Sequence, residues 1–227
     1  MNYATYEYIN EERAVVRVKI GDMSTPVWFQ NRWDGDSHEF SGFIVRNGCG
    51  HCCAAMASTL HGHPITPLEE YILCRELWGA PNEVRNPDGT KSGQANFQSV
   101  DGIAKIIRHF GIPAKVHGIP DLESAEKNME SALKCGKQVI FCTRHDPANP
   151  DNPFSTGYHW VMAVGYTESG SILVANSSEK YTKVGIQEVD MPTILRAICL
   201  GASPADFTWG EWCGEGFLGG VGYIVVG

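Results

Sequence analysis

The sequence predicts an α+β domain in which most helices come before a group of antiparallel strands. Segments with helical periodicity dominate residues 49–135, and short apolar segments typical of strands dominate residues 138–188. The turn at Glu168-Ser169-Gly170 favours antiparallel pairing of the strands beside it. The chain has 227 residues, 43% of them hydrophobic. It is therefore long enough to bury a core, and we expect one domain over residues 1–227.

Two strands are expected before the first helix. Residues 13–20 alternate between apolar and polar side chains, and residues 25–30 supply a second strand. Gly21 and Asp22 belong to the turn between them. Residues 31–48 are rich in turn formers and aromatic side chains and are expected to lead into the helix.

Four helices are expected next. The first starts at the glycine-rich stretch around Cys49, ends near residue 61 and should bury one face. Thr66 to Glu69 has the form of a capping box with proline at the first helical position, so a second helix should run to about residue 77. Apolar periodicity predicts the third and fourth helices over residues 100–110 and 122–135, with Asp121 capping the fourth.

Strands dominate the rest of the chain. They are expected at residues 114–117, 138–143, 158–166, 171–175, about 183–188 and 223–226, with one more helix near 191–199. Two long polar segments, residues 79–95 and 144–157, are predicted to be loops that shape a substrate cleft.

Charge and hydropathy exclude some classes of function. The formal net charge is −8, which argues against a nucleic-acid partner, because such a partner needs a basic surface. No run of 18 apolar residues is present, so no membrane span is expected. The first residues have neither a basic start nor an apolar stretch typical of a signal peptide. We therefore expect a cytoplasmic setting.

The chain contains eight cysteines. Cys53, Cys74, Cys135 and Cys199 lie in apolar helical contexts and are predicted to be buried thiols. Without a signal peptide, reduced thiols are expected.

Cys49 is the candidate nucleophile. It lies at the predicted start of the first helix, between Gly48 and Gly50. The unpaired N–H groups and the positive end of the helix dipole favour an anion there, which would lower the pKa of a thiol. The flanking glycines leave room for the backbone of a substrate.

A nucleophilic cysteine needs a base, a group that orients the base, and donors for the oxyanion. His159 is the candidate base, because it lies on an otherwise apolar strand. Asn176 ends the following strand, and a hairpin would bring the two side chains together. The side-chain amide of Gln30, with the Cys49 backbone N–H, could donate hydrogen bonds to an oxyanion.

The order Gln30, Cys49, His159, Asn176 resembles that of the papain-like cysteine peptidases. The nearer resemblance is to the branch with the bacteriocin leader-processing (double-glycine) peptidases and their standalone bacterial relatives. It rests on Phe29-Gln30-Asn31-Arg32-Trp33, Gly48-Cys49-Gly50-His51, Gly157-Tyr158-His159-Trp160, Val174-Ala175-Asn176-Ser177 and the segment Leu133 to Ile140.

The resemblance implies a papain-like fold, with an N-terminal nucleophile helix packed on an antiparallel sheet, and a Cys-His-Asn triad. It covers roughly residues 25–180, and residues 185–227 match no motif of the branch. Two further departures stand at single positions: His51 replaces the usual proline, and Asn176 replaces the commoner aspartate.

Simpler structural roles remain open for these residues. Cys49 could be a buried structural thiol, and His159 could be a core histidine. The Gln30 side chain could simply form a hydrogen bond with the backbone, and Asn176 could be an ordinary turn residue. The group Cys49, His51, Cys52, Cys53, His61 and His63 could bind a metal, but its spacing matches no structural zinc site. Asp34-Gly35-Asp36 lacks the other ligands of a calcium loop. We expect no metal and no cofactor.

The sequence thus predicts a cysteine hydrolase that cleaves a peptide or related amide bond, with a peptide or protein as substrate. Two alternatives use the same fold. One is a catalytically inactive module that binds a peptide or protein. The other is an acyltransferase, in which an amine replaces water in the second step.

Overall fold

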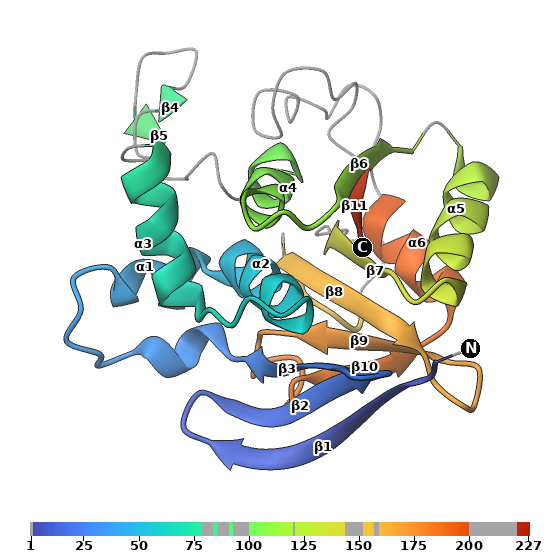
Figure 1. Ribbon diagram of the computed structural model, residues 1–227, viewed down its shortest axis with the longest axis horizontal. Helices are drawn as coiled ribbons and strands as arrows, with labels where there is room; N and C mark the ends of the chain where they lie inside the picture. Colours follow the sequence, from blue (N-terminus) through green and yellow to red (C-terminus); the bar gives the residue numbers. More distant parts are fainter. Residues whose placement is uncertain are drawn as a thin grey trace.

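The computed structural model describes residues 2–78, 84–85, 91–92, 100–119, 121–143, 152–156, 159–199 and 222–227. These residues form a mixed α+β structure built on two antiparallel sheets and the helices that cover them (Figure 1). The predicted α+β class agrees with this architecture. The predictions for residues 79–95, for most of 144–157 and for most of the C-terminal segment fall outside the described residues. Within the first of these segments, β4 (Val84–Arg85) pairs antiparallel with β5 (Lys91–Ser92).

The larger sheet has six strands in the order β10-β9-β8-β7-β11-β6. Every neighbouring pair is antiparallel, as predicted for the later strands. The sequence did not predict the place of the last strand, which lies between β7 and β6. The strands are β6 (Ala114–Gly118), β7 (Gln138–Thr143), β8 (His159–Tyr166), β9 (Ile172–Asn176), β10 (Ile186–Val189) and β11 (Gly222–Val226).

The smaller sheet consists of β1 (Ala4–Glu11), β2 (Ala14–Ile20) and β3 (Met23–Trp28). Sequence analysis found β2 and most of β3 but missed β1, which is mostly exposed and has too few apolar residues to show a strand pattern. The expected end of the second strand at Gln30 was also wrong. Gln30 instead begins the short 3-10 helix η1 (Gln30–Trp33).

Helices cover both faces of the six-stranded sheet (Figure 1). One face packs against α2 and α4 and against the small sheet, and the other packs against α5 and α6. A further helix, α1, was not predicted, because it is short and lies in a turn-rich segment. The helices are α1 (Ser41–Asn47), α2 (Cys49–Leu60), α3 (Pro67–Trp78), α4 (Val100–His109), α5 (Leu122–Lys134) and α6 (Met191–Cys199).

The predicted helix caps are confirmed. The Thr66 backbone N–H and hydroxyl both donate to Glu69 Oε2 at 2.8 Å, and the Glu69 N–H donates back to the Thr66 hydroxyl at 3.3 Å. At the start of α5, the Ser124 N–H donates to Asp121 Oδ1 at 2.7 Å. These side chains satisfy N–H groups that have no partner within the helix.

Helix α2 differs from the prediction of one buried face. Ten of its 12 residues are buried, since it packs against β3, α3, α4 and β8. Its many small side chains allow this close approach on several sides. Burial is correctly predicted for Cys53 and Cys74, whereas the prediction for Cys135 was wrong: this residue ends α5 and is exposed. Among the described residues, no helix is long and apolar enough to cross a membrane.

Gly48 joins α1 to α2 in a tight connection. Its N–H donates to the Ile44 carbonyl at 2.8 Å, and its own carbonyl accepts from the Cys52 N–H at 2.8 Å. A Cβ at this position would lie 2.8 Å from Ile44 Cγ2 and 2.9 Å from Ile44 Cα, and closer still to the Ile44 carbonyl oxygen. The turn that leads into the Cys49 helix therefore requires glycine.

We predict that Gly48→Ala lowers the free energy of unfolding by about 2 kcal/mol, because the new methyl group overpacks against backbone atoms. Urea denaturation measures this change. Gly42→Ala is the matched control: it lies in α1, where a Cβ meets only Arg46 Nη2 at 3.6 Å. The control should gain about 0.5–1 kcal/mol from helix propensity. Equal effects of the two substitutions would contradict the steric account.

Candidate active site

Cys49 is the first residue of α2 and lies next to the start of β8. No side chain caps this helix, and its first turn has no acidic residue. The Cys49 side chain is partly buried against the core. Its thiol accepts a hydrogen bond from the backbone N–H of Trp160, which belongs to the peptide group that joins His159 to Trp160. The structure therefore places Cys49 beside the backbone of His159.

The electrostatic environment of Cys49 differs from the sequence prediction. Burial raises the pKa of the Cys49 thiol, and the backbone N–H groups of Trp160, Gly50 and Cys49 itself offset this only in part. The expectation that the helix start would lower this pKa was therefore wrong for this state. Desolvation opposes the charged form more strongly than the nearby dipoles support it.

His159 and Asn176 lie together, as the sequence predicted. His159 Nε2 and Asn176 Oδ1 are 2.8 Å apart, and both side chains are buried. Because the asparagine oxygen can only accept, Nε2 is the donor, and Nδ1 is left as the basic nitrogen of the neutral ring. Burial lowers the pKa of His159, and the hydrogen bond to Asn176 opposes this shift.

A β-bulge in β8 makes this contact possible. Tyr166 pairs with Ile172 and Gly165 with Leu173, but Ala163 pairs with Val174, so β8 has one extra residue at this point. Beyond the bulge, Val161 pairs with Asn176. Side chains alternate between the two faces of a sheet, and a shift of one residue reverses the face. The bulge therefore puts Asn176 on the same face as His159.

The Asn176 side chain has three further partners that could not be predicted from the sequence. The Ser178 backbone N–H donates to its Oδ1 at 3.0 Å. Asn176 Nδ2 donates to the Phe154 carbonyl at 3.1 Å and to Gln187 Oε1 at 2.9 Å. Gln187 lies on β10 and is held in turn by the Pro153 carbonyl. These bonds fix which end of the amide faces His159. A polar residue inside the β10 pattern was the available indication for Gln187, but its direction depended on the strand register.

Gln30 lies between the two halves of the site. Its Nε2 donates to the Val45 carbonyl at 3.2 Å, and its backbone N–H donates to the Ser177 carbonyl at 3.0 Å. The Ser177 hydroxyl donates to Gln30 Oε1 at 3.4 Å. Gln30 thus links α1, which precedes Cys49, to the residue that follows Asn176. An amide nitrogen carries two hydrogens, so one bond to Val45 leaves Nε2 able to donate another.

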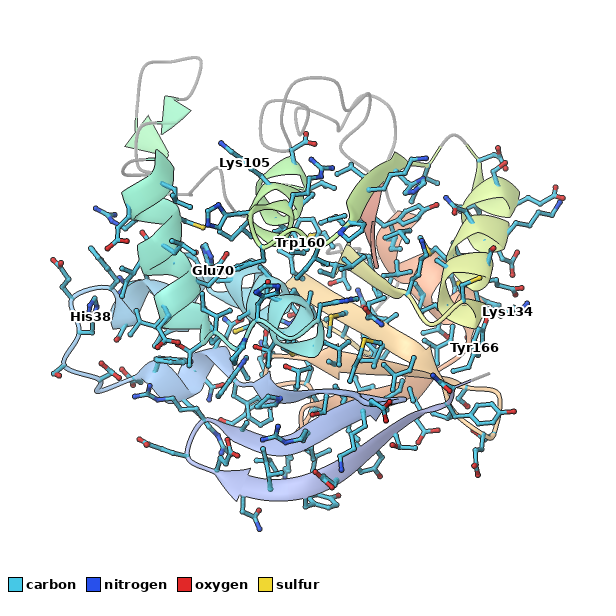
Figure 2. All side chains as sticks on the ribbon, in the orientation of Figure 1. His38, Glu70, Lys105, Lys134, Trp160 and Tyr166 are labelled. Carbon is cyan, nitrogen blue, oxygen red and sulfur yellow. The ribbon has the colours of Figure 1, made fainter. Side chains whose placement is uncertain are left out.

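A second polar group lies between α2 and α3. His51 Nδ1 is in close contact with Glu70 Oε2, and both side chains are 1% exposed. The Cys74 thiol donates to Glu70 Oε1 at 3.4 Å. Figure 2 shows Glu70 on the side of α3 that faces α2. The position of the unusual His51 is thus explained by its buried contact with Glu70, which a single sequence does not reveal.

The arrangement of the histidine and cysteine side chains gives limited support for a metal site. The proposed sequence cluster does not converge, because His51 turns to Glu70 while His61 Nε2 bonds to Gln138 Oε1 at 2.8 Å. Within the described part of the chain, His51, Glu70 and Cys74 have ligand atoms within 4.8 Å of one another. These atoms already bond to each other, and three ligands are fewer than a closed structural zinc site uses.

No protein-family model matches the chain, and no curated protein matches it. Among solved structures, the chain is similar to one from Bacillus anthracis described as a "putative C39-like peptidase". The TM-score is 0.46 with 14% sequence identity, over 79% of this chain and 88% of that chain.

The raised pKa of Cys49 predicts how its reactivity depends on pH. A thiol with a raised pKa is mostly protonated at neutral pH, so alkylation of Cys49 should increase through pH 9, above the ordinary range of a thiol near 8.5. Limiting iodoacetamide followed by peptide mass spectrometry measures this rate, with the exposed Cys135 as reference. Fast alkylation of Cys49 at pH 6 would instead show a thiolate–imidazolium pair.

The buried pair predicts a large effect of Glu70→Ala. Removal of the Glu70 carboxylate leaves the buried His51 ring without this partner, so the free energy of unfolding should fall by about 3 kcal/mol. Glu76→Ala, at an exposed position of the same helix, should change it by no more than about 0.5 kcal/mol. Urea denaturation compares the two variants. A loss below about 1 kcal/mol for Glu70→Ala would contradict the account of a stabilising buried pair.

Proposed function

We propose that this chain is a cysteine hydrolase that cleaves a peptide or related amide bond. The observation that carries the proposal is the buried hydrogen bond of 2.8 Å between His159 and Asn176, at the strand end against which Cys49 lies. A histidine held in one tautomer, at a strand end whose backbone bonds to a thiol at a helix start, supplies the base and the nucleophile that nucleophilic catalysis requires.

In the proposed mechanism, the Cys49 sulfur attacks the carbonyl carbon while His159 Nδ1 takes up the thiol proton. The resulting imidazolium is stabilised by Asn176 Oδ1, which accepts the hydrogen bond from Nε2. His159 then protonates the leaving amine, and the C–N bond breaks to give a thioester. Water, deprotonated by His159, hydrolyses the thioester and releases the acid.

The oxyanion needs two donors in this scheme. The Cys49 backbone N–H is one, because it lies at the start of α2, where the N–H groups point toward the N-terminal end of the helix. The second hydrogen of Gln30 Nε2 is the other. The bond of Gln30 to the Val45 carbonyl positions this amide beside the turn that carries Cys49.

The pKa directions describe the resting state of this pair. Burial raises the pKa of Cys49 and lowers the pKa of His159, so both shifts favour a neutral thiol and a neutral imidazole. Proton transfer then accompanies attack on the substrate and need not precede it. A neutral resting pair also supports the inactive binding module as the second candidate, which turnover would exclude.

We predict that Cys49→Ala reduces turnover at least about 10³-fold, since it removes the nucleophile. His159→Ala should cost about 10²–10⁴-fold, the usual contribution of a general base. Cleavage of fluorescein-labelled casein and of a fluorogenic peptide-amide library measures activity, and circular dichroism checks the fold.

Cys135→Ala, at an exposed site, is the matched control and should keep full activity. Full activity of Cys49→Ala would refute the proposal. Tight peptide binding by the wild-type chain without turnover or labelling by a thiol-directed inactivator would favour the binding module. Conjugates formed when amines are added would favour acyl transfer.

A further inference from the structure

The first turn of α2 carries a second thiol that the proposed mechanism does not use. Cys49 and Cys52 are separated by Gly50 and His51, which gives a Cys-x-x-Cys sequence at a helix N-terminus. Cys49 is partly exposed, whereas Cys52 is 0% exposed. Dithiols of this spacing and position undergo thiol–disulfide chemistry in other folds.

We propose that Cys49 and Cys52 form a redox-sensitive dithiol, in which a hydroperoxide oxidises Cys49 and Cys52 closes a reversible disulfide with it. The site is a modification site whose oxidant is hydrogen peroxide or an organic hydroperoxide. Its consequence for catalysis, reversible loss of activity, rests on the proposed function, whereas formation of the disulfide does not.

The helix geometry suits this bond. Residues three apart in an α-helix have Cα atoms about 5 Å apart, within the range of about 4.4–6.8 Å for disulfides. The first turn of a helix can tighten to 3-10 geometry, in which side chains three apart eclipse each other. Cys53, four residues from Cys49, gains nothing from such tightening. This makes Cys52 the better resolving thiol.

The groups around the three thiols also distinguish Cys52 from Cys53 as the disulfide partner of Cys49. Cys49 lies at the backbone of Trp160, and the Ser177 hydroxyl forms a hydrogen bond with Cys52. Ser177 directly follows Asn176, so both thiols lie at the strand ends that carry His159 and Asn176. Cys53 lies within electrostatic range of Cys49, Cys52 and Cys142, so the Ser177 hydrogen bond is what distinguishes the surroundings of Cys52 from those of Cys53.

The His51 side chain holds the turn between the two thiols. It contacts Glu70 on α3, while the backbone bond from Cys52 N–H to the Gly48 carbonyl closes the turn at 2.8 Å. The two cysteines are therefore presented from one anchored turn. Closing the disulfide needs only a local adjustment, and the rest of α2 stays packed.

The chemistry balances in two steps. The Cys49 thiolate attacks one peroxide oxygen, the O–O bond breaks, and the leaving hydroxide takes up a proton to become water. The Cys52 sulfur then attacks Cys49 sulfenic acid, the S–O bond breaks, and the second water leaves with the Cys52 proton. Two thiols lose two electrons in total, and one hydrogen peroxide becomes two waters. A dithiol reductant reverses the change.

Burial of the Cys49 and Cys52 thiols affects how easily the disulfide between them is reduced. It raises the pKa of each one, so neither is stabilised as a thiolate in the reduced chain. Stabilisation of the reduced form is what makes some Cys-x-x-Cys disulfides easily reduced. That contribution is absent here, so the disulfide, once formed, should persist until a reductant is added. Oxidation should be slow at pH 7 and faster at pH 9.

The test uses the full chain with a tenfold excess of hydrogen peroxide over protein. After catalase treatment, N-ethylmaleimide blocks the remaining thiols, and mass spectrometry examines the peptide that contains Cys49, Cys52 and Cys53. We expect this peptide to lose two hydrogens and to carry one label instead of three. Dithiothreitol should restore all three thiols and, with them, peptide cleavage.

Two matched variants identify the partner. Cys53→Ala should form the same disulfide as the wild type, whereas Cys52→Ala should instead accumulate sulfinic acid at Cys49 and lose activity irreversibly. Sulfinic acid without any disulfide in the wild type, or an equal yield of disulfide in Cys52→Ala, would overturn the proposal.

The two proposals fail in different ways in this experiment. If the disulfide forms in a chain that cleaves no peptide, the hydrolase proposal fails and the redox site stands. If cleavage occurs but peroxide never joins Cys49 to Cys52, the redox proposal fails and the hydrolase proposal stands.

Discussion

The register between β8 and β9 is the constraint on which the candidate site depends. Without the extra residue in β8, the pairing of Gly165 with Leu173 would continue, and Asn176 would lie opposite Met162. Its side chain would then point to the face of Trp160 and Met162, away from His159. The bulge interrupts the regular hydrogen bonding between β8 and β9 at one position. It also gives the His159 imidazole a partner that fixes its tautomer.

The bulge is also where the small sheet approaches. A Cβ on Gly165 would lie 2.8 Å from Ile20 Cδ1 and 3.3 Å from Ala4 Cβ, so glycine allows β1 and β2 to pack against β8. On the same face, α2 reaches β8 through cysteine and alanine side chains. Small residues at both places bring three elements close together. This packing places the start of α2 at the start of β8, next to the peptide group that joins His159 to Trp160.

Much of this arrangement could be predicted from the sequence, because local patterns determine it. The caps at Thr66 and Asp121, and the hairpin that carries His159 and Asn176, follow from residue types at fixed spacing. The face on which Asn176 lies depends on one extra residue inside an apolar strand, which no local pattern marks. The partners of His51 and Gln187 depend on which elements pack together. A single sequence contains no direct record of such contacts.

The direction of the Cys49 pKa shift shows how local and global electrostatics compete. The helix start supplies N–H groups and a partial positive charge, which alone would favour a thiolate. Packing removes the water that would solvate that charge, and desolvation is the larger effect. The Glu70 carboxylate, held near the same turn by His51, adds a negative charge that raises the pKa of Cys52. The first turn of α2 is thus held by the buried contact between His51 and Glu70, and the charge of Glu70 opposes ionisation of the Cys52 thiol in that turn. A thiol in this environment stays protonated until a base removes its proton. For the proposed reaction, the contact with Asn176 that the bulge gives His159 therefore matters more than the helix dipole.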